Sequence, residues 1–420
     1  MSLLIKNARV IDPSRNFDEV TDIFVDNGVI KGFGMFTNAD EIIYADGFIA
    51  APGLVDMHVH LRDPGQTDKE DILSGCEAAA AGGVTSLLAM PNTVPATDSA
   101  ETIKYIREKA ADAKAKVYIA AAITKGLKSE EATDLDELKE AGAVALSDDG
   151  RPVGDLSMLI NAMKRAPELG MTVTAHCESL EIADGGIINE GEVSRKLGVP
   201  GIPAAAEDCG TMREITLAEA FDVPVHICHV STKSSVALIR EAKKRGVKVT
   251  AETAPHYFTF TEKELLKRDA DYRMNPPLRR EEDMLAVIGG LADGTLDAIA
   301  TDHAPHTPEQ KSDFVAAPNG SIGMETSLAA GITALVSKGY LTINELIQKM
   351  STSPAGILGI EAGSLREGSP ADIVIFDMNE SHTVDPKLFH GKSRNTPFKG
   401  MRLKGKVKYT VVNGEIVYKD

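Results

Sequence analysis

Two histidines separated by one residue stand at the end of an apolar run, in the segment LVDMHVHLRDPG at residues 54–65. Residues i and i+2 of a strand point to the same face, so His58 and His60 lie side by side, and Arg62 can continue that face. Imidazole nitrogens are common ligands of zinc and similar divalent ions. The triplet therefore predicts a metal site with a positive charge beside it, where a buried strand meets solvent.

Imidazole and carboxylate side chains also follow three later apolar runs. His176 follows TVTA, His229 follows VHIC, and Asp302 follows AIAT. If these runs are parallel strands of one barrel, their carboxyl ends lie at the same face, and the three side chains meet His58 and His60 there. A buried cluster of this kind without a metal ion would carry a large desolvation cost. The whole set therefore predicts a metal centre.

A pair of carboxylates, Asp148 and Asp149, follows another short apolar run at residues 144–146. Neighbouring residues of a strand point to opposite faces, so only one of the two carboxylates can point inward. Asp149 is favoured because it adjoins Gly150, and the residue next to a glycine is freer to turn towards the centre.

Other histidines and cysteines of the chain are expected outside the ligand set. His306 lies in the loop beyond Asp302, and we expect it to contact the substrate. Cys177 and Cys228 adjoin two of the candidate ligands and are expected to face outward as small core residues. The remaining histidines are expected to pack behind the site or to lie at the surface: His226, His256, His303, His382 and His390.

The elements that must position these side chains are eight apolar runs that alternate with amphipathic stretches. The predicted strands are Leu54–Met57, Thr85–Ala89, Val117–Ala121, Val144–Leu146, Thr172–Ala175, Val225–Cys228, Val247–Ala251 and Ala298–Thr301. A helical stretch follows each strand, the first at Lys69–Ala81 with Thr67 and Glu70 as its capping box. This order predicts an α/β fold, a (β/α)8 TIM barrel with its site at the carboxyl ends of the strands. A doubly wound sheet is the alternative, but no GxGxxG motif follows the early strands.

Both ends of the chain have short strands and turns in place of this alternation. The segments DNGVIKGFG and YTVVNGEIVYKD each centre on Asn-Gly, which is typical of a tight hairpin. Each end alone is too small to hold a β core. We therefore expect residues 1–52 and 361–420 to form one composite β domain, and residues 53–360 to form the barrel.

Composition narrows the functional classes. The net charge is −17, from 45 basic and 62 acidic residues, so the surface repels nucleic acid and anionic membranes. No apolar run is long enough for a membrane span, and the N-terminal residues lack the layout of a signal peptide. Four scattered cysteines without a CxxC pair fit reduced thiols. We expect a cytoplasmic enzyme that binds a small molecule.

Ordered motifs along the chain carry a resemblance to a known family. They are VDMHVHLRDPG, GGVTSLLAMPNT, ALSDDG, TAHCES, CHVST, MNPPLR and ATDHAPH, with GSLREGSPADIVIFD and NTPFKGMRLKGKV near the end. In order and spacing this set resembles the class I dihydroorotases of the amidohydrolase superfamily. The resemblance covers nearly the whole chain, and the ordered set is far more specific than HxH alone.

The resemblance implies a role for each candidate residue. His58, His60 and Asp302 would hold one metal ion, His176 and His229 a second, and Asp149 would bridge them. The implied cofactor is Zn²⁺, one or two per subunit, and Asp302 would be the catalytic proton shuttle. The implied substrate contacts are Arg62, Asn92, Asn275, His306, Asn319 and Gly320. Asn319 departs from the family pattern, where an apolar residue is commoner.

The reaction implied by the resemblance is the reversible hydrolysis of L-dihydroorotate to N-carbamoyl-L-aspartate in pyrimidine biosynthesis. Arg62 would grip the substrate carboxylate with two parallel hydrogen bonds, and Asn92 and Asn275 would add neutral donors. Hydantoinases, dihydropyrimidinases and allantoinases are the alternative enzymes. Those relatives typically bridge their metals with a carboxylated lysine after the fourth strand, where this chain has Ser147-Asp148-Asp149.

Two expectations concern movement and partners. The polar loop at residues 311–320 is expected to be mobile and to close over the site. A non-catalytic scaffold for aspartate transcarbamoylase is the alternative from another functional class, but such relatives usually lose ligands, and here each expected ligand is present. An active enzyme is also compatible with that partner and with a homodimer.

Overall fold

The parallel strands of the middle of the chain form a barrel. The computed structural model describes all of residues 1–420, and eight strands form one sheet in the order β15-β14-β13-β10-β9-β8-β7-β6. They are β6 (Leu54–Val59), β7 (Val84–Ala89), β8 (Lys116–Ala121), β9 (Ala145–Leu146), β10 (Thr172–Ala175), β13 (Val225–Ile227), β14 (Val249–Thr253) and β15 (Ala298–Ile299). A parallel bridge between Val59 and His303 joins the two edges. The predicted (β/α)8 barrel is confirmed.

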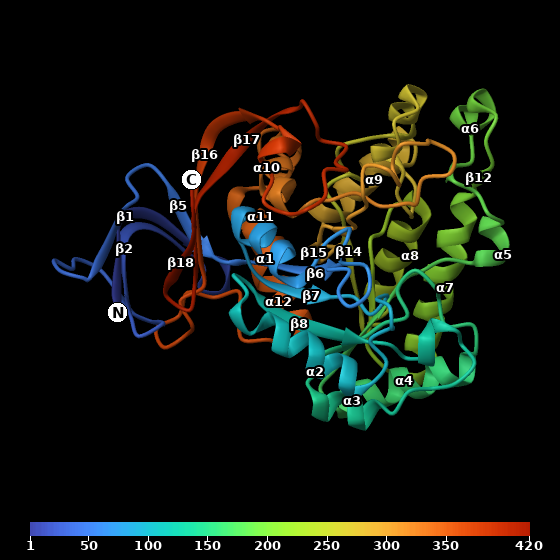
Figure 1. The fold of residues 1–420 in the computed structure, drawn as a ribbon, viewed down its shortest axis with the longest axis horizontal. Coiled ribbons are helices and arrows are strands. Elements are labelled where there is room, and N and C mark those ends of the chain that lie inside the picture. Colours follow the sequence, from blue (N-terminus) through green and yellow to red (C-terminus); the bar gives the residue numbers. More distant parts are fainter.

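Helices surround this barrel in the order expected for strand–helix units (Figure 1). The main ones are α1 (Ile72–Ala81), α2 (Ala100–Lys109), α3 (Leu135–Ala141), α4 (Leu156–Glu168), α7 (Ala204–Phe221), α8 (Lys233–Lys244), α9 (Glu281–Ala292) and α10 (Ser327–Gly331). Short elements follow β10, namely α5 (Leu180–Ala183), β11 (Ile188–Asn189), α6 (Glu192–Leu197) and β12 (Gly201–Ile202), and α11 (Ile343–Ile347) and α12 (Ser353–Leu358) follow α10. A core cluster of 76 buried residues spans strands and helices of this body, so burial of apolar surface holds its layers together.

Two predicted boundaries were wrong. The first helix begins at Ile72 with Asp71 as its N-cap, whose side chain accepts from the Ser74 amide, so Thr67 and Glu70 form no capping box. Glu70 is buried instead and accepts a hydrogen bond from the amide of Lys392. The seventh strand runs from Val249 to Thr253 and not from Val247 to Ala251, a shift that places another residue at its end.

Strands from both ends of the chain form the second sheet, as predicted. Its order is β18-β17-β16-β5-β1-β2-β3, with β4 also paired to β1. The strands are β1 (Ser2–Asp12), β2 (Phe17–Asp26), β3 (Val29–Phe33), β4 (Glu41–Tyr44), β5 (Ile49–Pro52), β16 (Ile373–Thr383), β17 (Arg402–Val412) and β18 (Glu415–Lys419). Antiparallel pairing of β5 with β16 joins the two ends. The limits proposed for the two domains stay a prediction.

The two predicted hairpins are also present in this sheet. Asn27-Gly28 joins β2 to β3 and Asn413-Gly414 joins β17 to β18, and all four residues have positive φ. Positive φ at both central positions is the conformation that favours Asn-Gly in two-residue hairpins. Figure 1 shows this sheet at one end of the molecule, beside the barrel and away from α5 and α6.

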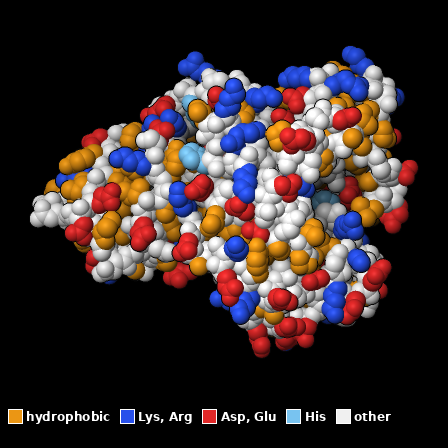
Figure 2. All heavy atoms as spheres, viewed as in Figure 1, with side chains coloured by type: hydrophobic (Ala, Val, Ile, Leu, Met, Phe, Trp, Pro, Cys, Tyr) orange, Lys and Arg blue, Asp and Glu red, His pale blue; other side chains and the backbone are white.

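The surface carries charges of both signs. On the face shown in Figure 2, basic and acidic side chains are interspersed. None of the helices is both long and apolar enough to cross a membrane.

Candidate metal centre

A cavity of about 260 Å³ lies at the carboxyl ends of the barrel strands. Its lining brings together His60, Arg62, Asn92, Asp149, Gly150, His176, His229, Asn275, Asp302, Ala304, His306, Asn319 and Gly320. The predicted site residues therefore meet around one cavity, with His58 buried next to them. A larger hollow of about 760 Å³ also touches His306, but it contains no other histidine.

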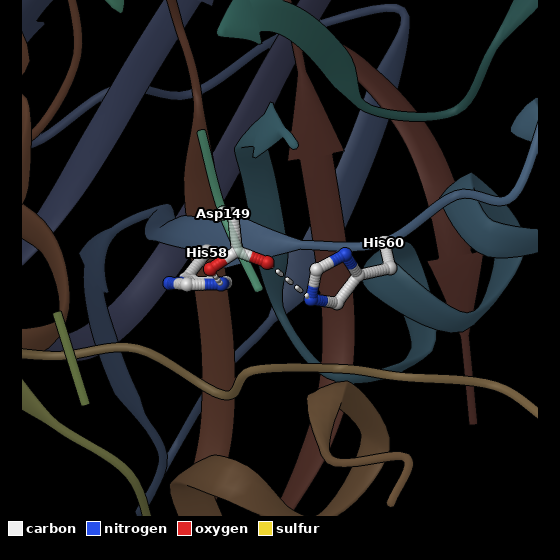
Figure 3. Close-up of side chains that lie close together, drawn as sticks. All are labelled: His58, His60 and Asp149. Atoms are coloured by element: carbon white, nitrogen blue, oxygen red, sulfur yellow. Dashed lines mark ion pairs between the residues drawn. The ribbon is translucent and has the colours of Figure 1, made fainter. Parts of the chain in front are cut away.

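His58 and His60 point towards Asp149 from the end of β6 (Figure 3). The Nε2 atom of His58 lies 3.3 Å from Asp149 Oδ1, and Nε2 of His60 lies 3.6 Å from Asp149 Oδ2. Asp302 approaches the same two rings, since its Oδ1 lies 3.1 Å from His60 Nε2 and 3.6 Å from His58 Nε2. Two imidazoles and two carboxylates thus converge on one point.

A second group of three donors shares Asp149. The Nδ1 atom of His176 lies 3.0 Å from Nε2 of His229, and Asp149 Oδ1 lies 3.7 Å and 3.8 Å from these nitrogens. His229 has a φ of 37° and Asp302 a φ of 49°, so the backbone leaves the extended conformation at both residues. These left-handed conformations redirect both side chains at strand ends.

The donor set fits divalent metal ions. His58 Nε2 and Asp149 Oδ1 are buried, face each other and have no hydrogen-bond partner. Such unpaired buried polar atoms are costly unless a ligand satisfies them. Two of the groups that could hold a metal ion are His58–His60–Asp149 and Asp149–His176–His229. Within each group, the three ligand atoms lie within 4.8 Å of one another. Imidazole nitrogen and carboxylate oxygen are ligands suited to zinc and related ions.

Glu252 is the main residue of this region that sequence reasoning missed. It lies on β14, is buried, and its Oε1 is 3.1 Å from Nδ1 of His58. The predicted strand ended at Ala251, so Glu252 was not identified as a residue at the strand end. The available signal was a carboxylate directly after the strand residues VTA, in the run VTAET.

Glu252 also contacts His226, whose Nε2 lies 3.3 Å from Glu252 Oε2. His226 therefore packs behind the ligand set, as expected. The prediction that Cys228 faces outward was wrong, because its sulfur lies within 4.8 Å of donor atoms of His58 and Glu252. Strand alternation explains this, since Val225 and Ile227 pack in the core cluster that spans strands and helices, and His226 and Cys228 take the opposite face. Cys177 packs in that same core cluster.

Arg62 places a positive charge at the edge of the cavity. Its side chain is buried, its Nε donates to the carbonyl of Pro305 at 3.3 Å, and it forms no ion pair with a protein carboxylate. Burial lowers the pKa of Arg62 to about 10, and the nearby Asp302 and Asp149 oppose that shift. The guanidinium is therefore charged at neutral pH with its two terminal nitrogens available.

One of the two predicted amides contacts two candidate metal ligands, and the other contacts a neighbouring glutamate. Asn92 Oδ1 lies 2.7 Å from His60 Nδ1, and Asn92 Nδ2 donates to Asp149 Oδ2 at 3.2 Å. Asn275 Nδ2 donates to both carboxylate oxygens of Glu178 at 3.2 Å. Both amides are therefore held in place before any substrate binds, which lowers the entropy cost of a contact.

His306 and Gly320 lie close together in the lining of the cavity. His306 Nε2 lies 2.8 Å from the carbonyl of Asn319, and because a carbonyl only accepts, this nitrogen carries the proton. Burial, followed by the charges of Arg62 and Lys311, lowers the pKa of His306 to about 3, so the ring is neutral. Gly320 has a φ of +134°, and a Cβ there would lie 2.7 Å from Ala304 Cβ, so only glycine fits.

Two cations anchor the loop at residues 311–320. Lys311 is buried, and its ammonium donates to the carbonyls of Arg273, Pro318 and Gly320 at 3.3, 3.1 and 2.9 Å. Arg273 donates to the carbonyl of Phe314 at 2.7 Å. In this structure the loop is fastened to the barrel, and its predicted mobility stays a prediction.

The other histidines lie away from the cavity. His303 is buried, and its Nδ1 accepts from the amide of Gly323 at 3.2 Å. His256 packs against the ring of Tyr257. His390 is exposed and lies 2.9 Å from Glu325, whereas His382 is only partly exposed. No hydrogen bond or ion pair joins these side chains to the candidate metal ligands.

Comparisons with known proteins place the chain among cyclic amidohydrolases. The family model described as dihydro-orotase-like matches residues 47–235, and the amidohydrolase family model matches residues 159–418. The chain is 50% identical to a dihydroorotase of Geobacter metallireducens, with all of both chains covered. It is 49% identical to a dihydroorotase of Acetivibrio thermocellus, with 100% of this chain and 99% of the relative covered.

Solved structures with the same architecture have other names. An L-hydantoinase (dihydropyrimidinase) from Arthrobacter aurescens has a TM-score of 0.89 at 25% identity, with 99% of this chain and 96% of that chain covered. A dihydropyrimidinase from Brevibacillus agri has a TM-score of 0.87 at 26% identity, covering 100% and 95%. The sequence identity to the two dihydroorotases is thus about twice the identity to these two solved structures.

Proposed function

Since this chain belongs to the dihydroorotase family of amidohydrolases, we propose that it catalyses the reversible hydrolysis of L-dihydroorotate to N-carbamoyl-L-aspartate. This reaction opens a cyclic amide with water, and its reverse closes the ring during pyrimidine biosynthesis. The relatives at 47–50% identity all carry the name dihydroorotase and cover essentially the full chain.

The choice of substrate is based on the guanidinium of Arg62, which forms no ion pair within the protein. It is buried at the cavity and paired with no protein carboxylate. Leaving a buried charge unpaired is costly, and a substrate carboxylate would relieve that cost with two parallel hydrogen bonds. Dihydroorotate carries such a carboxylate, whereas hydantoin and dihydrouracil are uncharged rings. The site therefore favours the anionic substrate over those of the structural neighbours.

The residues proposed to hold the cofactor are those whose donor atoms converge. His58, His60 and Asp302 would hold one ion, and His176 and His229 the other, with Asp149 between them. We propose Zn²⁺ as the ion. When bound, such an ion supplies a Lewis acid that polarises a carbonyl and makes water acidic enough to act as a nucleophile near neutral pH.

Asp302 is proposed to move the proton. Burial alone would raise its pKa, but the hydrogen bond from His60 and the charges of the neighbouring histidines lower it to about 2, so it begins as a carboxylate. It accepts a proton from the attacking water as the water oxygen bonds to the ring carbonyl carbon. As the bond between that carbon and the ring nitrogen breaks, Asp302 returns the proton to the nitrogen. One water molecule is consumed.

Arg62, Asn92, Asn275, His306, Asn319 and Gly320 are proposed to bind and orient the substrate. Arg62 would hold the carboxylate, which fixes the position of the ring relative to Asp302. Asn92 and Asn275 are held by His60 and Glu178, so each presents its amide in a set direction. Fixing the reacting groups in this way lowers the entropy cost of the reaction.

Turnover of four rings tests this function directly. Dihydroorotate, hydantoin, dihydrouracil and allantoin are offered to metal-loaded and chelator-stripped protein. We expect metal-dependent turnover of dihydroorotate alone. Turnover of an uncharged ring in its place would keep the metal centre but reject the substrate, and no turnover with metal bound would favour the scaffold role.

Location and assembly complete the proposal. All four cysteines are free thiols, three of them buried, which supports a reducing compartment and hence the cytoplasm. A homodimer and a complex with aspartate transcarbamoylase are the proposed assemblies. Sedimentation of the protein alone tests the homodimer, and sedimentation with aspartate transcarbamoylase tests the complex.

A further inference from the structure

A segment near the C-terminus lies against the cavity although no residue of the proposed catalytic set belongs to it. This rim segment, Gly391–Phe398, lies between β16 and β17 of the terminal sheet. In Figure 1 the red chain between these strands leaves the sheet and reaches towards the barrel. Its Ser393 hydroxyl donates to the carbonyl of His306 at 3.0 Å and lies 2.8 Å from the carbonyl of Lys69.

Asn395 is the residue of the rim segment with the most contacts to the cavity wall. It is 4% exposed. Its Oδ1 accepts from the amide of His306 at 3.1 Å, and its Nδ2 donates to the carbonyls of Ala304 and Gly320, both at 3.1 Å. The side chain therefore uses its acceptor and both of its donors on the backbone of two separate loops.

These contacts surround the anchor of Arg62. Ala304 and His306 flank Pro305, whose carbonyl accepts from Nε of Arg62 at 3.3 Å. Gly320, on the other loop, follows Asn319, whose carbonyl lies 2.8 Å from His306 Nε2. One amide thus sets the distance between the loop that orients Arg62 and the loop that orients His306.

We propose that Asn395 is a positioning residue for the carboxylate end of the substrate. It acts through Pro305, His306 and Gly320, and it touches none of the proposed metal ligands. The inference rests on the proposed function, because it assumes that Arg62 and His306 meet the substrate. The rim segment would therefore contribute to substrate affinity, but not to metal binding or to the proton transfer.

Asn395→Asp is the sharpest test, because it changes a single group of nearly equal size. The carboxylate keeps the acceptor for the His306 amide but sets an oxygen against two carbonyls in place of two N–H donors. We expect KM for dihydroorotate to rise about tenfold or more, from the loss of two buried hydrogen bonds. We expect kcat to stay within about threefold and the metal content to stay equal to that of the unchanged protein, since no ligand moves.

The pH dependence of KM provides a second measurement, which would not change if Asn395 had only a structural role. Below the pKa of the new carboxyl group, its protonated form regains one O–H donor for a carbonyl. The KM ratio between Asn395→Asp and the unchanged protein should therefore shrink as the pH falls. Asn379→Asp, the same chemical change at an exposed residue of β16, should show no shift in KM at any pH.

The outcomes separate this inference from the proposed function. If the unchanged protein fails to turn over dihydroorotate, the proposed function falls with it. If that protein is active and Asn395→Asp has an unchanged KM, only the positioning role falls. Loss of metal from Asn395→Asp, or a fall in its kcat without a rise in KM, would also overturn the positioning role. Asn395→Ala, which removes the contacts without repulsion, should repeat the rise in KM, and insolubility of both variants would show a folding role instead.

Discussion

Inside the barrel, the Nδ1 atom of His58 lies 3.1 Å from Glu252 Oε1, and Nε2 of the same ring lies 3.3 Å from Asp149 Oδ1. An ionised carboxylate only accepts, so Nδ1 carries a proton, and Nε2, which faces Asp149, is the nitrogen left to bind a metal ion. Glu252 also has its pKa lowered to about 2, because hydrogen bonds from His226 and His58 outweigh its burial. Contacts of this kind set the tautomer and direction of metal-binding histidines.

Glu252→Gln should weaken metal binding without removing a ligand. Loss of the negative charge makes the His58 ring less basic and less firmly oriented, and we expect about a tenfold loss of metal affinity. Competition with a chelator of known affinity measures it. Glu241→Gln on the exposed side of α8 is the matched control, and equal affinities in the two variants would reject the role of Glu252.

His58→Ala should reduce the metal content. The substitution removes the nitrogen nearest to Asp149 Oδ1, and the next nearest nitrogens, on His176 and His229, lie 3.7 and 3.8 Å from that oxygen. Elemental analysis after dialysis should show less metal per chain than in His390→Ala, a change at an exposed histidine. An unaltered stoichiometry would remove His58 from the ligand set.

Asp302→Asn should keep the fold and lose most turnover. The amide has the size of the carboxylate but cannot accept and return a proton, and loss of general acid–base catalysis costs about a hundredfold to ten-thousandfold in rate. Steady-state kinetics in both directions, together with circular dichroism, measure rate and fold. Near-full activity would rule out the proton shuttle.

Arg62→Ala should distinguish charged from uncharged rings. Truncating one partner of a buried charge pair costs about 2–5 kcal/mol, so kcat/KM for dihydroorotate should fall by roughly thirtyfold to several thousandfold. Any slow turnover of dihydrouracil should change little, because that ring has no carboxylate. Equal losses on both substrates would reject the assignment of Arg62 as carboxylate anchor.

Lys311→Met should change both the loop and the pH dependence of stability. Burial lowers the pKa of Lys311 from 10.5 to about 8, so between these values the folded chain binds fewer protons than the unfolded chain. The stability of the unchanged protein relative to the variant should therefore rise as the pH increases from about 8 to about 10.5, by up to about 3 kcal/mol.

Chemical denaturation of both proteins at several pH values measures this difference. The variant also loses three hydrogen bonds to loop carbonyls, so proteolysis within residues 311–320 should be faster at pH 7. A flat stability difference across the pH range would show that Lys311 titrates normally.

Much of the fold and of the candidate site could be predicted because strand ends are visible in the sequence. The ends of β6, β10 and β13 carry His58, His176 and His229, and a parallel barrel brings such ends to one face. Cys228 shows the limit of this reasoning. Its direction depends on which face of β13 points into the barrel, and the buried run VHIC does not reveal which face that is.

The sequence by itself determined which imidazoles and carboxylates would meet and that a guanidinium would lie beside them. It could do so because these side chains follow successive strands at a spacing that a single architecture accounts for. Only the tertiary structure decided the roles of Glu252 and Asn395. Glu252 depends on where β14 begins and ends, and Asn395 reaches Ala304, His306 and Gly320 from 75 to 91 residues away in the chain. Contacts at such separations are set by the packing of the terminal sheet against the barrel, which no local pattern encodes.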